Sequence, residues 1–159
     1  MKTFIFDLDH TVIDSSHRQI TLADGSLDLD NWIANCTQEK IMADKLLPLA
    51  QHWRRLQAAG NEIVVCTARV MGVWDHVFLA DHGLTADAIL SRPLGCTDAD
   101  ADLKENLLRE YAQKTGRSWA RFSRNAAMYD DNMGVLNRLE SLGIDCYNAI
   151  SINNTLKAA

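Results

Sequence analysis

Residues 3–11, TFIFDLDHT, combine a short apolar run with two acids placed directly after it. Phenylalanine, isoleucine and threonine are frequent in β-strands, so Thr3 to Phe6 predict a buried strand near the amino terminus. Asp7 and Asp9 follow where this strand ends. Because open parallel sheets bind ligands at the carboxyl ends of their strands, these two acids are candidates for chemistry rather than parts of a solvated turn.

A strand-then-helix pattern continues over the rest of the chain. Further buried strands are predicted at residues 62–67, 86–90, 125–129 and 146–150. Helical spacing of apolar residues marks 45–59, 70–82, 102–115 and 132–142. These helices are followed by Gly60, Gly83, Gly116 and Gly143, as is common at helix C-termini. The alternation predicts an α/β, Rossmann-like fold, with a mainly parallel five-stranded sheet covered by helices on both faces.

The segment from Ser15 to Asp44 departs from this pattern, because it is polar, irregular and longer than a simple connection between a strand and a helix. Its place after the first strand predicts a small lid over a functional site. A tolerated surface excursion is the alternative. No repeat, low-complexity tract or linker divides the sequence, so we expect a single domain over residues 1–159 with residues 15–44 inserted into it.

The composition narrows the functional classes. The 47% hydrophobic content is typical of a globular domain, and the formal net charge of −5 argues against a broad basic face for long nucleic acids. This net charge does not exclude a protein that binds a single phosphate at the end of a nucleic-acid chain. The cysteines have neither CxxC nor zinc-site spacing, and no apolar run approaches the ~20 residues of a membrane span. We therefore expect a cytoplasmic protein without a membrane partner.

Polar residues follow the other predicted strands as well. Thr67 and Arg69 come at the end of the second strand, Asp130 and Asp131 at the end of the fourth, and Lys104 lies near the start of the helix region before it. The carboxyl ends of parallel strands meet at one edge of a sheet, so these side chains are expected to converge with the first two acids. Such a concentration of charge is costly unless the groups bind something.

Phosphate-ester hydrolysis explains this set of residues. A carboxylate can attack a phosphate only where cations cancel their mutual repulsion, so Asp7 as nucleophile needs a hard divalent ion, Mg²⁺, and a lysine. Asp130 or Asp131 would bind the ion with Asp7, and the sequence leaves open which of the two. Lys104 would neutralise the phosphoryl group, and Thr67 would bind one of its oxygens. Asp9 would be the general acid and base, which requires a pKa raised from its ordinary value of ~3.9.

Together, DLDHT at 7–11, TAR at 67–69, Lys104 and DD at 130–131 resemble the four motifs of haloacid-dehalogenase (HAD) superfamily phosphatases, in order. This resemblance implies an aspartyl-phosphate on Asp7 and a magnesium cofactor. One departure is His10, where many members have glycine; it is expected to alter a turn and to leave the chemistry unchanged.

The sequence also resembles one branch, the 3′-phosphatase domain of phage polynucleotide kinase, through Arg18, Arg69 and Asp100. No GxxxxGK[ST] phosphate loop of a kinase occurs in the sequence. The resemblance implies three groups of site residues. The catalytic group is Asp7, Asp9, Thr67 and Lys104. The substrate-binding group is Thr11, Arg18, Arg69 and Asp100. The metal-binding group is Asp7, Asp9, Asp130 and Asp131.

Three functions are compatible with these residues. The first is a phosphomonoesterase acting on 3′-phosphate ends of polynucleotides or on nucleotides, and the second is a nucleotidase or small-metabolite phosphatase of the same superfamily. A non-enzymatic phospho-acceptor module is the remote third, because such modules carry their acid pair on the first strand. Trp32, in the predicted lid, is the tryptophan to consider for stacking on a base.

Overall fold

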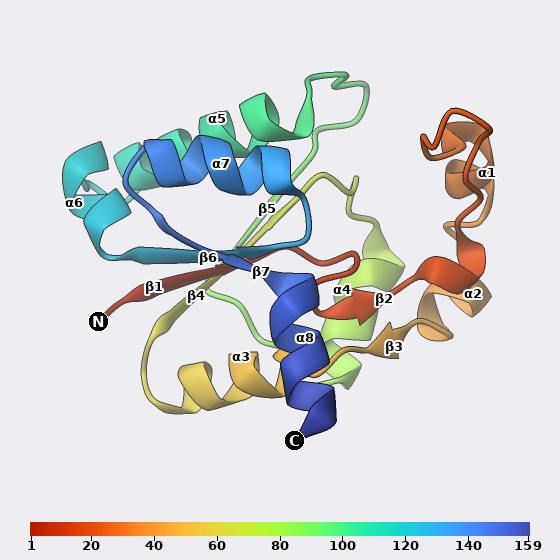
Figure 1. Cartoon of the computed structure of the whole chain (residues 1–159), viewed down its shortest axis with the longest axis horizontal. Helices are drawn as coiled ribbons and strands as arrows, with labels where there is room; N and C mark the ends of the chain where they lie inside the picture. The colour runs from red at the N-terminus through yellow and green to blue at the C-terminus, as the bar shows by residue number, and fades with distance from the viewer.

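The computed structural model describes all 159 residues and is built around a five-stranded parallel sheet (Figure 1). The strand order is β5-β4-β1-β6-β7. The strands are β1 (Thr3–Phe6), β4 (Glu62–Thr67), β5 (Ala88–Ser91), β6 (Ala126–Asp130) and β7 (Asp145–Asn148). This confirms the predicted fold class. Because the chain moves outward from β1 through β4 to β5 and then returns to β6, the strand order reverses beside β1, where α/β proteins bind ligands.

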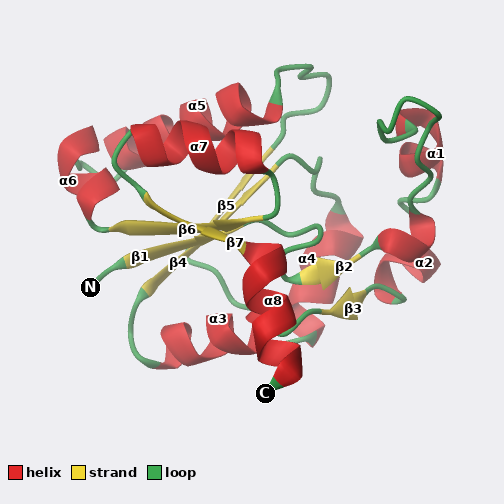
Figure 2. Cartoon of the chain, viewed as in Figure 1, coloured by secondary structure: helices red, strands yellow, loops and turns green.

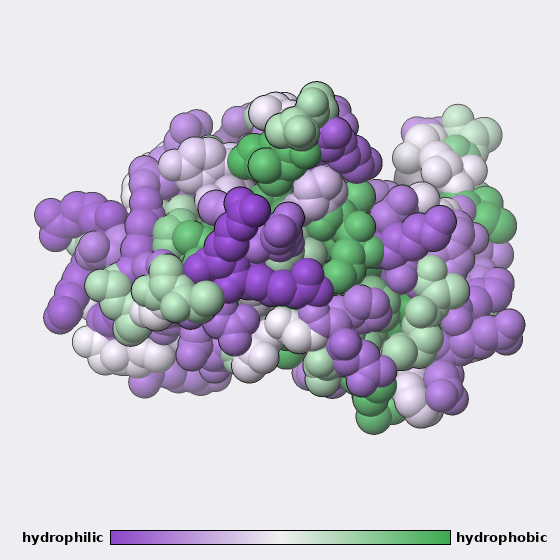
Figure 3. Space-filling model, turned by 90° about the horizontal axis from the view of Figure 1, so that it is seen from below, coloured by the Kyte–Doolittle hydropathy of each residue, from purple (hydrophilic) through white to green (hydrophobic).

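Helices cover both faces of the sheet (Figure 2). One face carries α5 (Asp100–Lys114), α6 (Trp119–Arg124) and α7 (Met133–Ser141), and the other carries α3 (Leu49–Ala58), α4 (Val73–Asp81) and α8 (Ala149–Ala158). Side chains alternate along each strand, so Ile5 of β1 enters one core and Phe6 enters the other. Seen from below in Figure 3, hydrophilic residues cover much of the surface around smaller hydrophobic areas. None of the helices combines the length and apolar character that crossing a membrane requires.

The segment from Ser15 to Asp44 lies outside the main sheet, at the end of the molecule toward which β1 runs (Figure 1). It leaves and rejoins the domain through a small antiparallel pair, β2 (Ile13–Asp14) with β3 (Lys45–Leu46). The segment is less irregular than predicted, because it contains η1 (Ser16–Arg18), α1 (Leu29–Ala34) and α2 (Gln38–Met42). Asp28 and Thr37 accept N-terminal backbone N–H groups of α1 and α2, respectively, and so define where these short helices begin.

Several element boundaries differ from the sequence prediction. The predicted helix 45–59 begins only at Leu49, because Lys45 and Leu46 pair with β2. The predicted strand 146–150 ends at Asn148, whose side chain caps α8, a helix that was not predicted. Helix α6 was also not predicted, because six residues carry too little periodicity to show a helical face. The four glycines predicted to end helices all have positive φ, as that role requires.

Trp53 of α3 provides a test of the core. Its side chain is fully buried, stacks on Phe6 at a centroid distance of 5.2 Å, and donates from Nε1 to the carbonyl of Thr85 at 3.0 Å. We expect Trp53→Ala to lower the free energy of unfolding by about 3–5 kcal/mol in urea denaturation, because it leaves a cavity between α3 and the sheet. Trp53→Phe, which keeps a ring but loses the donor, should cost about 1–2 kcal/mol. Equal losses in the two variants would contradict this account.

Candidate active site

The carboxyl ends of β1, β4 and β6 bring together side chains far apart in the sequence. Phe6 pairs in register with Val65 of β4 and with Tyr129 of β6. Asp7, directly after Phe6, therefore lies between the ends of two neighbouring strands, which carry Thr67 and Asp130. This arrangement agrees with the predicted convergence of the acids at one edge of the sheet.

Lys104 of α5 completes this edge from the helix layer above the sheet. Its Nζ lies 2.8 Å from Oδ1 of Asp7 and 2.7 Å from Oδ2 of Asp130, and only 2% of the residue is exposed. Burial alone would lower the pKa of the lysine, but the two carboxylates outweigh it and hold the pKa above its usual value. The ammonium group therefore stays charged beside the predicted nucleophile.

Asp7, Asp130 and Asp131 form a compact group, with one carboxylate oxygen of each within 4.8 Å of the others. Burial raises the pKa of Asp7 to about 7, although Lys104 acts in the opposite direction. Burial also raises the pKa of Asp130 and of Asp131. Carboxylates this close repel one another when ionised, and oxygen ligands in such a group suit a hard divalent cation. Asp130 is further held by Lys104 and by the N–H of Asn132 at 2.9 Å.

The side chain of Asp9 faces a different partner from the one predicted. It lies outside the three-carboxylate group and pairs with Arg69, Oδ1 with Nη2 at 2.6 Å and Oδ2 with Nε at 3.1 Å. Burial would raise the pKa of Asp9, but Arg69 outweighs it and lowers the pKa. In this conformation the predicted raised pKa is therefore wrong, and the carboxylate is not placed to bind a metal with the other acids.

Both predicted substrate-binding arginines are buried in ion pairs. Arg18 donates from Nε and Nη2 to the two oxygens of Asp44, each at 2.9 Å. Arg69 also donates from Nη1 to Asp75 at 2.5 Å. The ring of Trp32 lies over the Arg18 guanidinium at 4.1 Å and is only half-buried. Carboxylates of the protein occupy both guanidinium groups in this structure, and a role of either arginine in binding substrate stays a prediction.

Sequence reasoning missed Asp44 and Asp75, the partners of these arginines. Asp75 had a local signal, since it occupies the third position of α4 and accepts the N–H of Gly72 at 2.8 Å, as residues at helix starts often do. Asp44 had none, because its partner Arg18 is 26 residues away in the sequence.

The remaining predicted site residues, Asp100, Thr11 and Thr67, lie in three different environments. Asp100 pairs with Arg92 at 2.8 Å, and Arg92 also donates to the carbonyl of Ala68 at 2.9 Å. The acid therefore supports the loop after β4, and its role in binding substrate stays a prediction. Thr11 is fully buried with no hydrogen-bond partner for Oγ1, and its role in binding substrate stays a prediction. Thr67, at the end of β4, accepts the N–H of Arg69 at 3.1 Å.

His10 has φ 59°, the only positive φ outside glycine in the chain. This left-handed conformation explains why a glycine suits the position and costs other residues roughly 1–2 kcal/mol. His10 lines a groove of about 440 Å³, together with Asp131 and residues of α8. The groove is lined by His10, Asp14, Ser16, Leu47, Asp131, Ile150, Asn153, Asn154 and Lys157. The effect of His10 therefore extends beyond the turn to one wall of this groove.

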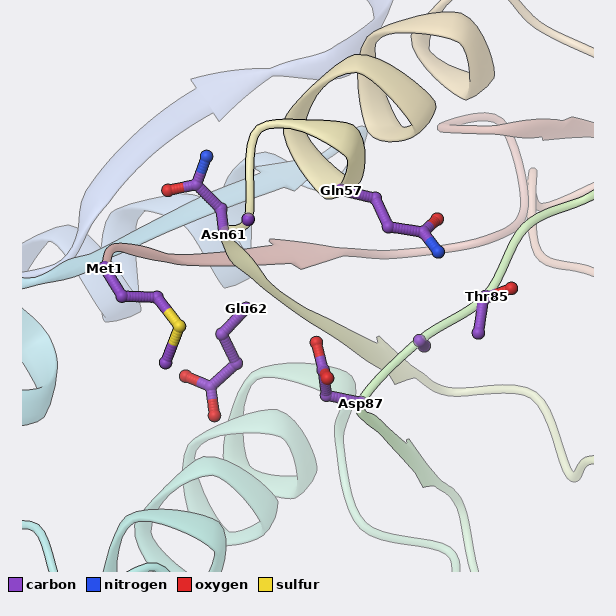
Figure 4. Close-up of a pocket in the computed structure, with 8 residues that line it drawn as sticks. Met1, Gln57, Asn61, Glu62, Thr85 and Asp87 are labelled. Atoms are coloured by element: carbon purple, nitrogen blue, oxygen red, sulfur yellow. The ribbon is translucent and has the colours of Figure 1, made fainter.

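A second cavity, of about 350 Å³, lies at the opposite edge of the sheet, where β1 and β4 begin (Figure 4). It is lined by Met1, Gln57, Gly60, Asn61, Glu62, Thr85, Ala86 and Asp87. Glu62 is already bound by Arg117 at 2.6 Å and by Tyr111 at 2.7 Å. None of the strand-end acids reaches this cavity, so the candidate active site remains the carboxyl edge.

Comparison with known proteins agrees with this geometry. A model of the bacteriophage T5 5′-deoxynucleotidase family matches residues 1–159. The 5′-deoxynucleotidase of Escherichia phage T5 is 30% identical over 170 aligned residues, which cover 98% of this chain and 70% of the phage enzyme.

Solved structures share the fold at low identity. A chain of the Pnkp1/Rnl/Hen1 complex matches with a TM-score of 0.67 and 19% identity, over 94% of this chain and 45% of that one. This chain therefore spans less than half of that protein. A haloacid dehalogenase-like hydrolase of Streptococcus pneumoniae matches with a TM-score of 0.65 and 12% identity, over 96% and 90% of the two chains. With a match to the family model over residues 1–159 and a relative that is 30% identical, the chain belongs to the bacteriophage T5 5′-deoxynucleotidase family.

Proposed function

We propose that this hydrolase is a magnesium-dependent nucleotidase that removes the 5′-phosphate of deoxynucleoside monophosphates through an aspartyl-phosphate on Asp7. The observation that carries the chemistry is the contact of Asp7 with the buried ammonium of Lys104, beside Asp130 and Asp131. Support for the substrate comes from the family and from the phage enzyme that is 30% identical.

The metal proposal rests on the donor set. The three clustered carboxylates offer hard oxygen ligands, and their mutual repulsion at a buried site is relieved by a divalent cation. Asp7, Asp130 and Asp131 would hold the ion. When bound, Mg²⁺ would polarise a phosphoryl oxygen and offset the negative charge of the substrate.

In the first step, Oδ of Asp7 attacks phosphorus and forms a new O–P bond. The P–O bond to the nucleoside breaks, and its electron pair stays on the 5′ oxygen. Asp9, whose pKa Arg69 lowers in the resting arrangement, must first take up a proton; it then gives that proton to the oxygen, so the nucleoside leaves as a neutral alcohol. Lys104 would neutralise the charge on the phosphoryl group, and the Thr67 hydroxyl, at the end of β4, would donate to one of its oxygens.

In the second step, water attacks the phosphorus of the aspartyl-phosphate while Asp9, now a carboxylate, takes the water proton. The bond between phosphorus and Asp7 breaks, which regenerates the free carboxylate and releases inorganic phosphate. Each proton that Asp9 gives in the first step is thus recovered in the second.

The 3′-phosphatase activity on polynucleotide ends is the second candidate. It is supported by the structural likeness to the Pnkp1 complex and by the sequence matches at Arg18, Arg69 and Asp100. The geometry makes it weaker, since those side chains pair with Asp44, Asp9 and Arg92 respectively.

The covalent mechanism predicts the behaviour of Asp7→Asn. An amide is a far weaker nucleophile than a carboxylate, so kcat should fall by at least about a thousandfold. The measurement is magnesium-dependent release of inorganic phosphate, with circular dichroism to check folding. Asp145→Asn is the matched control. Asp145 is an exposed acid at the start of β7, where it pairs with Lys2, and it lies away from the carboxyl edge of the sheet. Retention of more than a tenth of the activity by Asp7→Asn would exclude Asp7 as nucleophile.

The substrate proposal predicts a ranking among four phosphate esters. We expect the deoxynucleoside 5′-monophosphate to exceed the 3′-monophosphate, the 5′-phosphorylated oligonucleotide and the 3′-phosphorylated oligonucleotide by at least about tenfold in kcat/KM. Chelation with EDTA should abolish turnover, and added Mg²⁺ should restore it. A preference for the 3′-phosphorylated oligonucleotide would instead favour an end-healing enzyme.

A further inference from the structure

Arg69 lies among three carboxylates that come from different parts of the chain. Its Nη2 is 2.6 Å from Oδ1 of Asp9 and 3.7 Å from Oδ2 of Asp44, and its Nη1 is 2.5 Å from Asp75. Only 2% of the arginine side chain is exposed. One guanidinium nitrogen is therefore within ion-pair distance of two acids at once, one beside the nucleophile and one at the end of the inserted segment.

In the resting arrangement Arg69 holds both oxygens of Asp9. Its Oδ1 accepts from Arg69 Nη2 and from the Ser15 hydroxyl, and its Oδ2 accepts from Arg69 Nε. A general acid must approach the leaving oxygen to about 2.6–3.2 Å. Oδ2 of Asp9 accepts one bond and keeps a second lone-pair site, but as a general acid Asp9 must be protonated, and a neutral carboxyl holds a guanidinium less strongly than a carboxylate does. A buried guanidinium whose carboxylate partner is neutralised needs another one nearby.

Asp44 has the capacity to accept it. Its Oδ1 accepts from His17 at 2.8 Å and from Arg18 Nε at 2.9 Å, whereas its Oδ2 accepts only from Arg18 Nη2 at 2.9 Å. Each carboxylate oxygen has about two lone-pair sites, so Oδ2 retains one, and Arg69 Nη2 is the cation 3.7 Å from it.

We propose that Asp44 is a positioning residue, which takes over Nη2 of Arg69 when Asp9 turns to the leaving oxygen. This inference rests on the proposed role of Asp9 as the general acid. During that step the proton passes from Asp9 to the leaving oxygen as its bond to phosphorus breaks, and Arg69 exchanges one carboxylate partner for another without entering water.

The same contact links the inserted segment to the chemistry. Arg18, near its start, and Asp44, at its end, form a fully buried pair that closes residues 15–44 at their base. The ring of Trp32 in α1 lies 4.1 Å from the Arg18 guanidinium and 5.6 Å from that of Arg69. A change of partner by Arg69 thus takes place directly beneath the predicted lid.

Asp44→Asn tests the proposal, because the amide keeps the shape of the side chain but lacks the charge that attracts Arg69. The probes are phenyl phosphate, which needs a general acid, and p-nitrophenyl phosphate, whose more acidic leaving group needs little help. We expect kcat for phenyl phosphate to fall at least about tenfold, a share of the ~10²–10⁴-fold that a general acid contributes. The value for p-nitrophenyl phosphate should change by less than about threefold, with KM nearly constant for both.

Asp28→Asn is the matched control within the same segment, since asparagine caps α1 as well as aspartate does and Asp28 is outside the Arg69 cluster. It should leave both esters unchanged. Equal losses for the two esters in Asp44→Asn would show that Asp44 only supports the fold, and unchanged turnover of both would show that Arg69 does not need it. Either result overturns the proposal.

If Asp44→Asn does not fold, the double variant Arg18→Gln/Asp44→Asn removes both charges of the buried pair, which is less damaging than removing one. The same selective loss is expected, and an equal loss for both esters overturns the proposal. Neither probe is a nucleotide. A wild-type protein that cleaves both esters but no deoxynucleotide would refute the proposed substrate and leave the role of Asp44 measurable.

Discussion

The ammonium of Lys104 lies between the carboxylates of Asp7 and Asp130, at 2.8 and 2.7 Å, and almost no solvent reaches it. The carboxyl edge of the sheet depends on this contact, because the ends of neighbouring strands bring together the buried Asp7 and Asp130 and the half-buried Asp131. Without a cation their repulsion and desolvation would work against folding. Lys104 of α5 offsets part of this negative charge, and the charge that remains makes the edge suited to a divalent cation.

A second set of buried charges lies next to the first and differs in composition. There Arg18 and Arg69 are balanced by Asp9, Asp44 and Asp75, so cations and anions are more nearly matched. The first set keeps an excess of negative charge that suits a divalent cation, while the second is already balanced within the protein. This difference explains why Asp7 and Asp9, two residues apart, have pKa values shifted in opposite directions.

The position of the inserted segment follows from the same constraint. Residues 15–44 leave the domain immediately after the loop that carries the two acids and return through β3, and the Arg18–Asp44 pair closes them at the base. Asn153 of α8 fixes this region from the other side, since it donates to the carbonyl of Thr11 at 2.9 Å and accepts the N–H of Leu49 at 2.9 Å. The loop of the nucleophile is therefore held by elements from the middle and from the end of the chain.

The alternation of strands and helices, the parallel sheet and the acids at its carboxyl edge could be predicted from the sequence. These features depend on local composition and on the order of the motifs. Residues 62–67 form the predicted strand, and Lys104 meets Asp7 as the motifs implied. The tertiary structure alone decided which charges pair. Arg69 is 60 residues from Asp9 in the sequence, and Arg18 is 26 residues from Asp44. The partner of a long charged side chain depends on distances and burial in the folded chain, which no local sequence pattern shows. For the same reason β3, a strand of two residues, became visible only through its pairing with β2.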